Sequence, residues 1–408
     1  MVMNNIHGWS GTLQSWDFGV NGSVFAGHCR MLRRDTNELV CLDVKITNDT
    51  DAVHLGKLLV GNTHLEKLSM WIGGRLSLTG ACQITNGLKQ CKLIELRTDQ
   101  EGVTEAANEI ICALQKMNTI RKLEWNAIIE DDILPSLKSD LFGRILNLES
   151  LTLSGMKLTK DVMNDMCLSG LGENISIKNL KLANCGISNA SAVAFCNNWR
   201  VDSTIGVLEW QGNVLRGTAG VTALCRAVPF HASLNCLKLS GNGQIGYTGL
   251  EIIGNAMGDI RLKELHLNDC VQKRNQVYGQ HPENTSGHYQ VMQFRNSQEA
   301  AEWNLEDSRL EKKKRLLRNR AASALIEGSR KNVYLRNIYV RGNDLGEEAE
   351  DEIEVCGLCN KYRLAHHHDN SLPAALWQFI FANCQKDRTA KRFIYLLLRE
   401  NPSLLQIH

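Results

Sequence analysis

Three glycines in the stretch GNGQIG are spaced as in loops that bind nucleotide phosphates. Gly241, Gly243 and Gly246 form a GxGxxG that follows an expected strand and opens an expected helix. In a dinucleotide-binding loop, such glycines allow a tight turn and close approach of a pyrophosphate, which the helix N-terminus attracts. Glu264 and Asp269 lie near the distance along the chain at which a ribose-binding carboxylate is expected. This interpretation requires the glycines to be special to a nucleotide site and not part of a repeated loop.

A second group of residues could bind a metal ion. Cys356 and Cys359 form a CxxC, and His366–His368 follow shortly after it. Thiolate and imidazole ligands at this spacing suit a tetrahedral zinc site. The segment from 353 to 364 also fits the closing helix and next strand entry of a degenerate repeat unit. Zinc binding by these residues is therefore an open alternative.

No other pattern in the sequence indicates catalysis. The chain has no G-x-S-x-G nucleophile elbow, no P-loop and no H-E-x-x-H. Its 46 basic and 44 acidic residues give a net charge of +2, so no overall field attracts nucleic acid or a membrane. We therefore predict a protein that is not an enzyme, with no catalytic residues, no cofactor and no metal ligands beyond the open cysteine and histidine alternative.

The cysteines and the N-terminus predict a cellular compartment. The 14 cysteines are scattered through apolar segments, which suits reduced, buried thiols better than a disulfide framework. The N-terminus lacks the layout of a signal peptide, and no uncharged apolar run approaches the roughly 18 residues that span a bilayer. These features predict a cytoplasmic protein without membrane contact, and a nuclear location stays open.

The elements that would position these residues recur with a regular period. Each unit has apolar residues at its first, fourth and sixth places, as in Leu148, Leu151 and Leu153. Successive units start at nearly constant intervals, except for one long interval before the last. The unit starts are Leu13, Leu39, Leu65, Cys91, Ile120, Leu148, Ile177, Ile205, Leu234, Leu262 and Leu335.

Each unit pairs an expected strand with an expected helix. Apolar residues at helical spacing recur from one unit to the next, as in Leu224 and Ile253. The same shift places Val214 where the middle glycine of GxGxxG stands, which favours a repeat loop over a nucleotide site. The ninth place of most units holds a residue suited to hydrogen-bond the backbone of the turning loop. These residues are Asn21, Thr47, Asp99, Cys185, Asn213, Asn242, Cys270 and Asn343.

This pattern resembles the leucine-rich repeat family, and the alternation of a shorter and a slightly longer unit in the middle of the chain is similar to its ribonuclease-inhibitor-like subclass. The resemblance implies an α/β solenoid shaped as a horseshoe, with a parallel sheet on the concave face and helices on the convex face. We assign residues 1–364 to the repeat domain and residues 365–408 to a helical C-terminal cap.

The long interval before the last unit contains an insertion at residues 271–320. Its second part is predicted to be a helix that continues into the helix of the repeat. The basic run from 309 to 320 is interpreted as a solvated helix face balanced by nearby glutamates, with a nuclear-localisation or nucleic-acid patch as the alternative.

The concave face is the predicted binding surface. Its fifth-place residues predict an acidic N-terminal half and a basic or aromatic C-terminal half. Trp71 is predicted to lie beside Arg97, and both are residue types that often anchor interfaces, while Tyr339 and Arg341 form a second candidate pair. Trp16, Trp125 and Trp210 are predicted to be core residues. The predicted partner-binding residues are Trp71, Arg97, Glu95, Glu124, Lys181, Glu209, Lys238, His266, Tyr339 and Arg341.

The sequence thus predicts a monomeric, non-catalytic scaffold that binds a protein partner and not nucleic acid. The resemblance also implies an alternative, because one branch of the subclass activates the nuclear-transport small GTPase. Those activators carry a strongly acidic C-terminal stretch. The corresponding tail here contains Lys386, Arg388, Lys391 and Arg392, which favours the scaffold.

Overall fold

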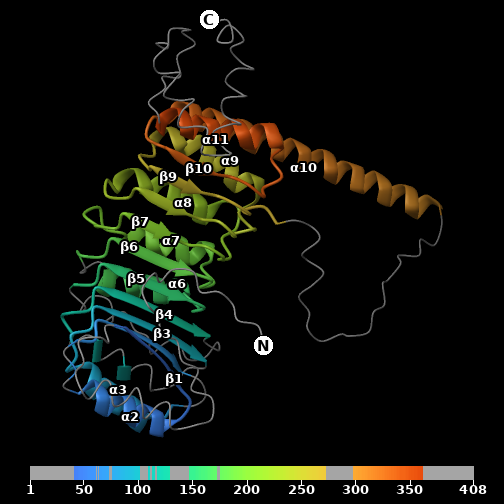
Figure 1. Ribbon diagram of the computed structural model, residues 1–408. Helices are drawn as coiled ribbons and strands as arrows, with labels where there is room; N and C mark the ends of the chain where they lie inside the picture. The colour runs from blue at the N-terminus through green and yellow to red at the C-terminus, as the bar shows by residue number, and fades with distance from the viewer. Residues whose placement is uncertain are drawn as a thin grey trace, which may run out of the picture.

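The computed structural model describes residues 41–272 and 297–361, with gaps at 61, 63, 73–75, 102–108, 111–112, 115–116, 129–146 and 172–174. In this part of the chain, ten strands form one parallel sheet in sequential order from β1 to β10 (Figure 1). The strands are β1 (Cys41–Ile46), β2 (Lys67–Ile72), β3 (Glu95–Glu101), β4 (Lys122–Ile128), β5 (Ser150–Ser154), β6 (Asn179–Ala183), β7 (Val207–Glu209), β8 (Cys236–Lys238), β9 (Glu264–His266) and β10 (Asn337–Tyr339).

In the described part of the chain, the helices lie between successive strands and pack side by side on one face of the sheet. The fold is therefore a leucine-rich repeat solenoid, as predicted. The helices are α2 (Asp49–Leu59), α3 (Leu78–Leu88), α6 (Lys160–Asp165), η2 (Met166–Leu171), α7 (Asn189–Asn198), α8 (Ala219–Ala227), η3 (Val228–Phe230), α9 (Gly246–Ala256), η4 (Met257–Asp259), α10 (Ser297–Lys331) and α11 (Glu347–Lys361). None of them, in the described part of the chain, is long and apolar enough to cross a lipid bilayer.

Several helices begin where the sequence provides a side chain that caps the first turn. The side chains of Asn48, Ser77, Thr159 and Ser188 each accept a hydrogen bond from the backbone N–H three residues later. Such caps satisfy amides that have no partner inside the helix. The predicted first unit at Leu13, Trp16 and the predicted cap at residues 365–408 lie outside the described residues.

One apolar row runs through the core from the first strand to the last. The fourth-place residue of each unit pairs with its counterpart on the next strand, and all of them are buried. The row consists of Leu42, Leu68, Leu96, Leu123, Leu151, Leu180, Leu208, Leu237, Leu265 and Ile338. Each such side chain stabilises the fold by roughly 1.5–3 kcal/mol, so neighbouring units stabilise one another. Trp125 and Trp210 are also buried, as predicted.

The structure corrects one unit start. Leu96 pairs with Leu68 and Leu123, which makes Leu93 and not Cys91 the first residue of the fourth unit. The sixth place of this unit is then Thr98, which is fully buried. The sequence favoured Cys91 because that register put three apolar residues in line. Cys91 instead precedes the unit, and its thiol donates a hydrogen bond to the Leu59 carbonyl at 3.0 Å.

Several ninth-place residues hydrogen-bond the backbone of the turning loops, as predicted. Asn343 Oδ1 accepts from the Cys270 amide at 2.7 Å, and its Nδ2 donates to the carbonyls of Leu267 and Val340 at 2.7 and 2.6 Å. Asn213 makes equivalent bonds in an earlier unit, and Asn242 donates to two carbonyls. The thiols of Cys185 and Cys270 also donate to the carbonyls of Leu153 and Leu239 in the preceding units. These bonds satisfy backbone groups that water cannot reach.

Two of the predicted ninth-place residues have other roles. Thr47 donates its hydroxyl to the Asp51 carboxylate at 2.6 Å and is exposed. Asp99 lies in the seventh place of the corrected unit, on the face of the sheet turned away from the helices. The prediction for Asp99 was wrong because it counted from Cys91.

The glycine loop is joined to the next unit by its backbone. Gly241 and Gly246 have positive φ angles of 76° and 64°, a region that glycine enters without strain. Their amides donate to the carbonyls of Asn268 and Cys270, both at 2.9 Å. Two of the N–H groups that a pyrophosphate could use are thus already bonded, which supports the repeat-loop interpretation.

The long helix α10 covers the segment for which the sequence predicts one continuous helix. Its C-terminal half packs against α9 and α11, whereas its N-terminal half projects beyond the stack (Figure 1). The contact with α9 is close at Gly254, where an added Cβ would lie 2.5 Å from the backbone of Ala324 and of Leu325. The preceding insertion residues, 273–296, lie outside the described part.

Candidate functional site

The concave face is the face of the sheet turned away from the helices, and a single row of side chains runs along it. We call this the concave row. It contains the fifth-place residue of each unit, and register pairs each member with the next. Its members are Asp43, Ser69, Arg97, Glu124, Thr152, Lys181, Glu209, Lys238, His266 and Tyr339.

The corrected unit start moves two predicted binding residues. Arg97 belongs to the concave row and pairs with Ser69, whereas Glu95 lies in the third place and pairs with Lys67. Trp71 pairs with Lys45 and Asp99, so the prediction that it lies beside Arg97 was wrong. The physical reason is that a two-residue shift keeps each side chain on the same face but moves it along the strand.

Charges along the concave face alternate and do not form the predicted gradient. Arg97 Nε lies 3.0 Å from Asp99 Oδ2, and its guanidinium also approaches Glu124 at 3.8 Å. Burial would lower the pKa of Arg97, but the hydrogen bond and charge of Asp99 outweigh it and raise that pKa. The N-terminal half of the surface therefore neutralises most of its own charge.

Other charged residues in this half are paired in the same way. Glu95 lies 3.1 Å from Lys67 Nζ and 3.9 Å from Lys122 Nζ. Lys45 Nζ sits 4.1 Å from the centre of the Trp71 ring, a cation–π contact. Trp71 is thus partly covered by its own neighbour on the concave face.

Glu209 is the most enclosed charge of the concave row. Its carboxylate lies 2.7 Å from Lys181 Nζ and 3.2 Å from Lys238 Nζ, and its side chain is only 10% exposed. Burial alone would raise the pKa of Glu209, but the hydrogen bond and charge of Lys181, together with the charge of Lys238, lower it. Three predicted binding residues therefore form one ion-paired group.

An aromatic pair ends the concave row. The rings of His266 and Tyr339 stack with their centres 4.3 Å apart, and Tyr339 remains 39% exposed. Burial, and next the charge of Lys238, lower the pKa of His266, which favours a neutral imidazole. The pair presents a rigid aromatic surface on two ordered strands.

Arg341 follows Tyr339 but binds within the chain. Its guanidinium contacts Asp351 at 2.7 Å and Glu354 at 2.8 Å, and a third carboxylate, Glu350, lies 3.6 Å away. These contacts join the end of β10 to α11. They also make Arg341 less available to a partner than its place in the sequence suggested.

Three side chains of metal-ligating type meet beside the aromatic pair. Cys236, Glu264 and His266 each offer one ligand atom, and these atoms all lie within 4.8 Å of one another. Of these three residues, the sequence analysis predicted only His266 to lie on the concave surface. The repeat pattern could have revealed the group, because Cys236 and Glu264 occupy the third place of adjacent units and therefore lie side by side on neighbouring strands.

The cysteine pair predicted as a zinc alternative is only partly described. Cys356 is buried in α11. The side chain of Cys359 and residues His366–His368 lie outside what the structure describes. The helix around Cys356 is the closing helix that the repeat interpretation predicted.

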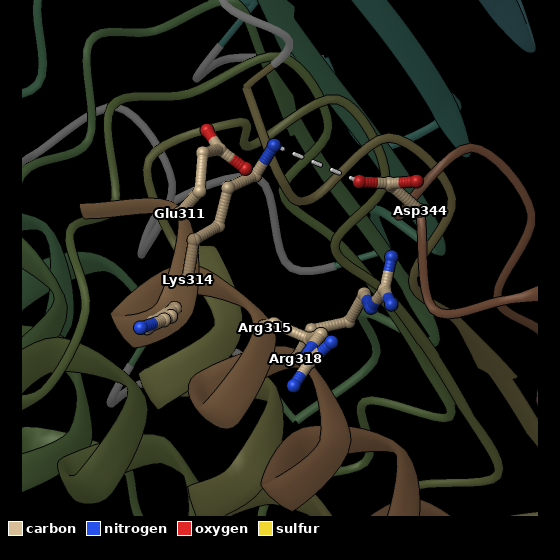
Figure 2. Close-up of a pocket in the computed structure, with 6 residues that line it drawn as sticks. Glu311, Lys314, Arg315, Arg318 and Asp344 are labelled. Atoms are coloured by element: carbon tan, nitrogen blue, oxygen red, sulfur yellow. Dashed lines mark ion pairs between the residues drawn. The ribbon is translucent and has the colours of Figure 1, made fainter. Parts of the chain in front are cut away.

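The basic run of α10 lies next to the loop after β10 (Figure 2). Lys314 Nζ is 3.8 Å from Asp344 Oδ2, which also accepts a hydrogen bond from the Tyr247 hydroxyl at 3.2 Å. The two elements border an open pocket of about 310 Å³, also lined by Glu311, Lys312, Arg315 and Arg318. Acidic groups within the pocket support the interpretation of the run as a solvated and partly paired helix face.

Comparisons with known proteins give a similarity in structure alone. No protein-family model matches the chain, and no curated protein is similar to it. Among solved structures, the chain is similar to the tropomodulin C-terminal domain from Caenorhabditis elegans, with 15% identity and a TM-score of 0.24. The match covers 41% of this chain and 90% of that one.

Proposed function

We propose that this chain is a non-catalytic scaffold that binds a protein partner on its concave face. We further propose that it belongs to the ribonuclease-inhibitor-like subclass of leucine-rich repeats. The paired leucines from β6 to β9 support the subclass, because the intervals that separate Leu180, Leu208, Leu237 and Leu265 alternate between a shorter and a slightly longer unit.

The stacked pair of Tyr339 and His266 is the observation that carries the proposal. An exposed aromatic side chain held on a strand loses little conformational entropy when a partner covers it. The charged residues before it, from Arg97 to Lys238, are mostly paired with one another. They would therefore contribute less to affinity than to the selection of a partner with a complementary charge pattern.

The size of the surface also supports a protein partner. Ten strands have nine spacings of about 4.8 Å, which gives a sheet roughly 43 Å long. A standard protein interface covers about 800 Å² on each partner, which fits on a sheet of this length. A small molecule would need a deeper and more enclosed site than an open sheet provides.

The test compares one concave and one convex aromatic residue. Full-length protein with a Tyr339→Ala substitution is used to purify partners from the source cell, beside wild type and Phe230→Ala. Phe230 is 68% exposed and lies in η3 on the opposite, helical side. We expect a partner that wild type and Phe230→Ala retain and Tyr339→Ala loses, at unchanged thermal stability. Loss with Phe230→Ala alone would place the partner on the convex face and contradict the proposal.

The second candidate function is activation of a small GTPase. It is supported by the same unit spacing, which is shared with the nuclear-transport activators that the sequence resembles. Its test is the rate of phosphate release from GTP-loaded small GTPases at micromolar concentrations of this protein. An unchanged rate would remove this candidate and leave the scaffold.

A further inference from the structure

A group of potential metal ligands lies at the C-terminal end of the concave face and shares His266 with the proposed partner surface. Cys236 projects from β8, and Glu264 and His266 project from β9. The Cys236 thiol donates to Glu264 Oε2 at a distance of 3.7 Å, and His266 Nε2 lies 3.6 Å from the same oxygen. A thiol, an imidazole and a carboxylate therefore point toward one shared point.

Two of the three separations between ligand atoms are close to those of a tetrahedral zinc site. With a Zn–S bond of about 2.3 Å and Zn–N or Zn–O bonds of about 2.0 Å, neighbouring ligand atoms lie roughly 3.3–3.5 Å apart. The observed separations of 3.6 and 3.7 Å are only slightly longer. The three ligand atoms all lie within 4.8 Å of one another, so side-chain movements could bring them around one ion.

The surroundings of the imidazole nitrogen also favour a bound ion. His266 Nε2 is inaccessible to solvent and has no hydrogen-bond partner in the described structure. Its nearest polar neighbour is Glu264 Oε2 at 3.6 Å, just beyond hydrogen-bond length, and a metal ion between the two atoms would satisfy both.

Neighbouring residues fix the orientation of two ligands. Asn337 Nδ2 donates to Glu264 Oε1 at 3.1 Å, which leaves Oε2 directed at the thiol and the imidazole. Tyr339 stacks on the His266 ring and fixes its plane. Groups that orient ligands in this way commonly change metal affinity about 10–100-fold when they are removed.

We propose that Cys236, Glu264 and His266 bind a zinc ion. The mixture of sulfur, nitrogen and oxygen ligands suits zinc better than calcium or magnesium, which prefer oxygen alone. On binding, a bond forms between zinc and Cys236 Sγ, and the thiol proton passes to solvent. Three protein ligands leave a fourth position, which a water molecule fills. Because the Glu264 side chain is 42% exposed, solvent can reach this position.

The experiment uses the full chain, reduced and treated with a chelator. Co²⁺ is titrated first, because a thiolate ligand gives a charge-transfer absorption in the near ultraviolet, and Zn²⁺ is then added to displace it. We expect one Co²⁺ per chain with this absorption, lost at one equivalent of Zn²⁺. Cys236→Ser and His266→Gln should each weaken binding at least about 10-fold, and so should Asn337→Ala through the orientation of Glu264.

Control variants separate this site from the other cysteines. Cys82→Ser, in α3 at the far end of the solenoid, should bind as wild type does. The double variant of Cys356 and Cys359 to serine should also bind normally. Metal binding that is lost in the double variant but kept in Cys236→Ser would overturn the proposal, as would the absence of Co²⁺ absorption in wild type. Circular dichroism without metal shows whether each variant folds. If Cys236→Ser does not fold, Glu264→Gln provides a further test of the site.

Discussion

Replacement of Thr98 by valine tests both the register of β3 and the energetics of its buried face. Thr98 occupies a core position between Met70 and Trp125, and its hydroxyl has no hydrogen-bond partner in the described structure. A buried hydroxyl without a partner costs about 1–3 kcal/mol. Valine has nearly the same shape and adds a methyl group, worth roughly 0.8 kcal/mol when buried. Thr98→Val should therefore stabilise the protein by about 2–4 kcal/mol.

The measurement is urea unfolding followed by circular dichroism and tryptophan fluorescence. Thr152→Val is the matched control, because Thr152 lies on the concave face of β5 and is only partly buried. Its effect should stay within about 0.5 kcal/mol. If unit starts were counted from Cys91, Thr98 would lie beyond the core positions and the substitution would gain nothing. No increase in stability, or an equal increase for both variants, would refute the reasoning.

Two further predictions concern packing and pH. Gly254→Ala should destabilise the fold by about 1–3 kcal/mol in urea unfolding, because the added Cβ would overlap the α10 backbone. Gly258→Ala is the control and should be almost neutral, because its Cβ would lie 3.8 Å from the nearest atom. Equal effects would contradict the close helix contact. Glu209→Gln should cost about 1 kcal/mol near neutral pH because Lys181 and Lys238 lose their shared counter-charge. Since folding lowers the pKa of Glu209, this stabilisation is present above the unfolded-state pKa of about 4.3 and disappears as the pH falls through the folded-state value. A difference between wild type and Glu209→Gln that persists in acid would show that the charge is not responsible.

The loop residues show how far sequence reasoning extends into side-chain chemistry. The asparagines at positions 213, 242 and 343 could be assigned a backbone-binding role because each follows the apolar triplet at a constant offset. The same offset failed for Asp99, where the count began two residues too early. The ninth-place assignment is therefore correct only where the first residue of the unit has been placed correctly.

The sequence by itself determined the repeating unit and most of the buried rows, because the apolar periodicity recurs within each unit, and the resemblance to leucine-rich repeats implied the parallel sheet. The sequence also identified Tyr339 and His266 as surface residues of adjacent strands. The tertiary structure decided which side chains meet across strands, such as Glu209 with its two lysines and Cys236 with Glu264 and His266. The physical reason is that such contacts join residues a whole repeat apart, and a shift of one or two positions in the stacking replaces every partner.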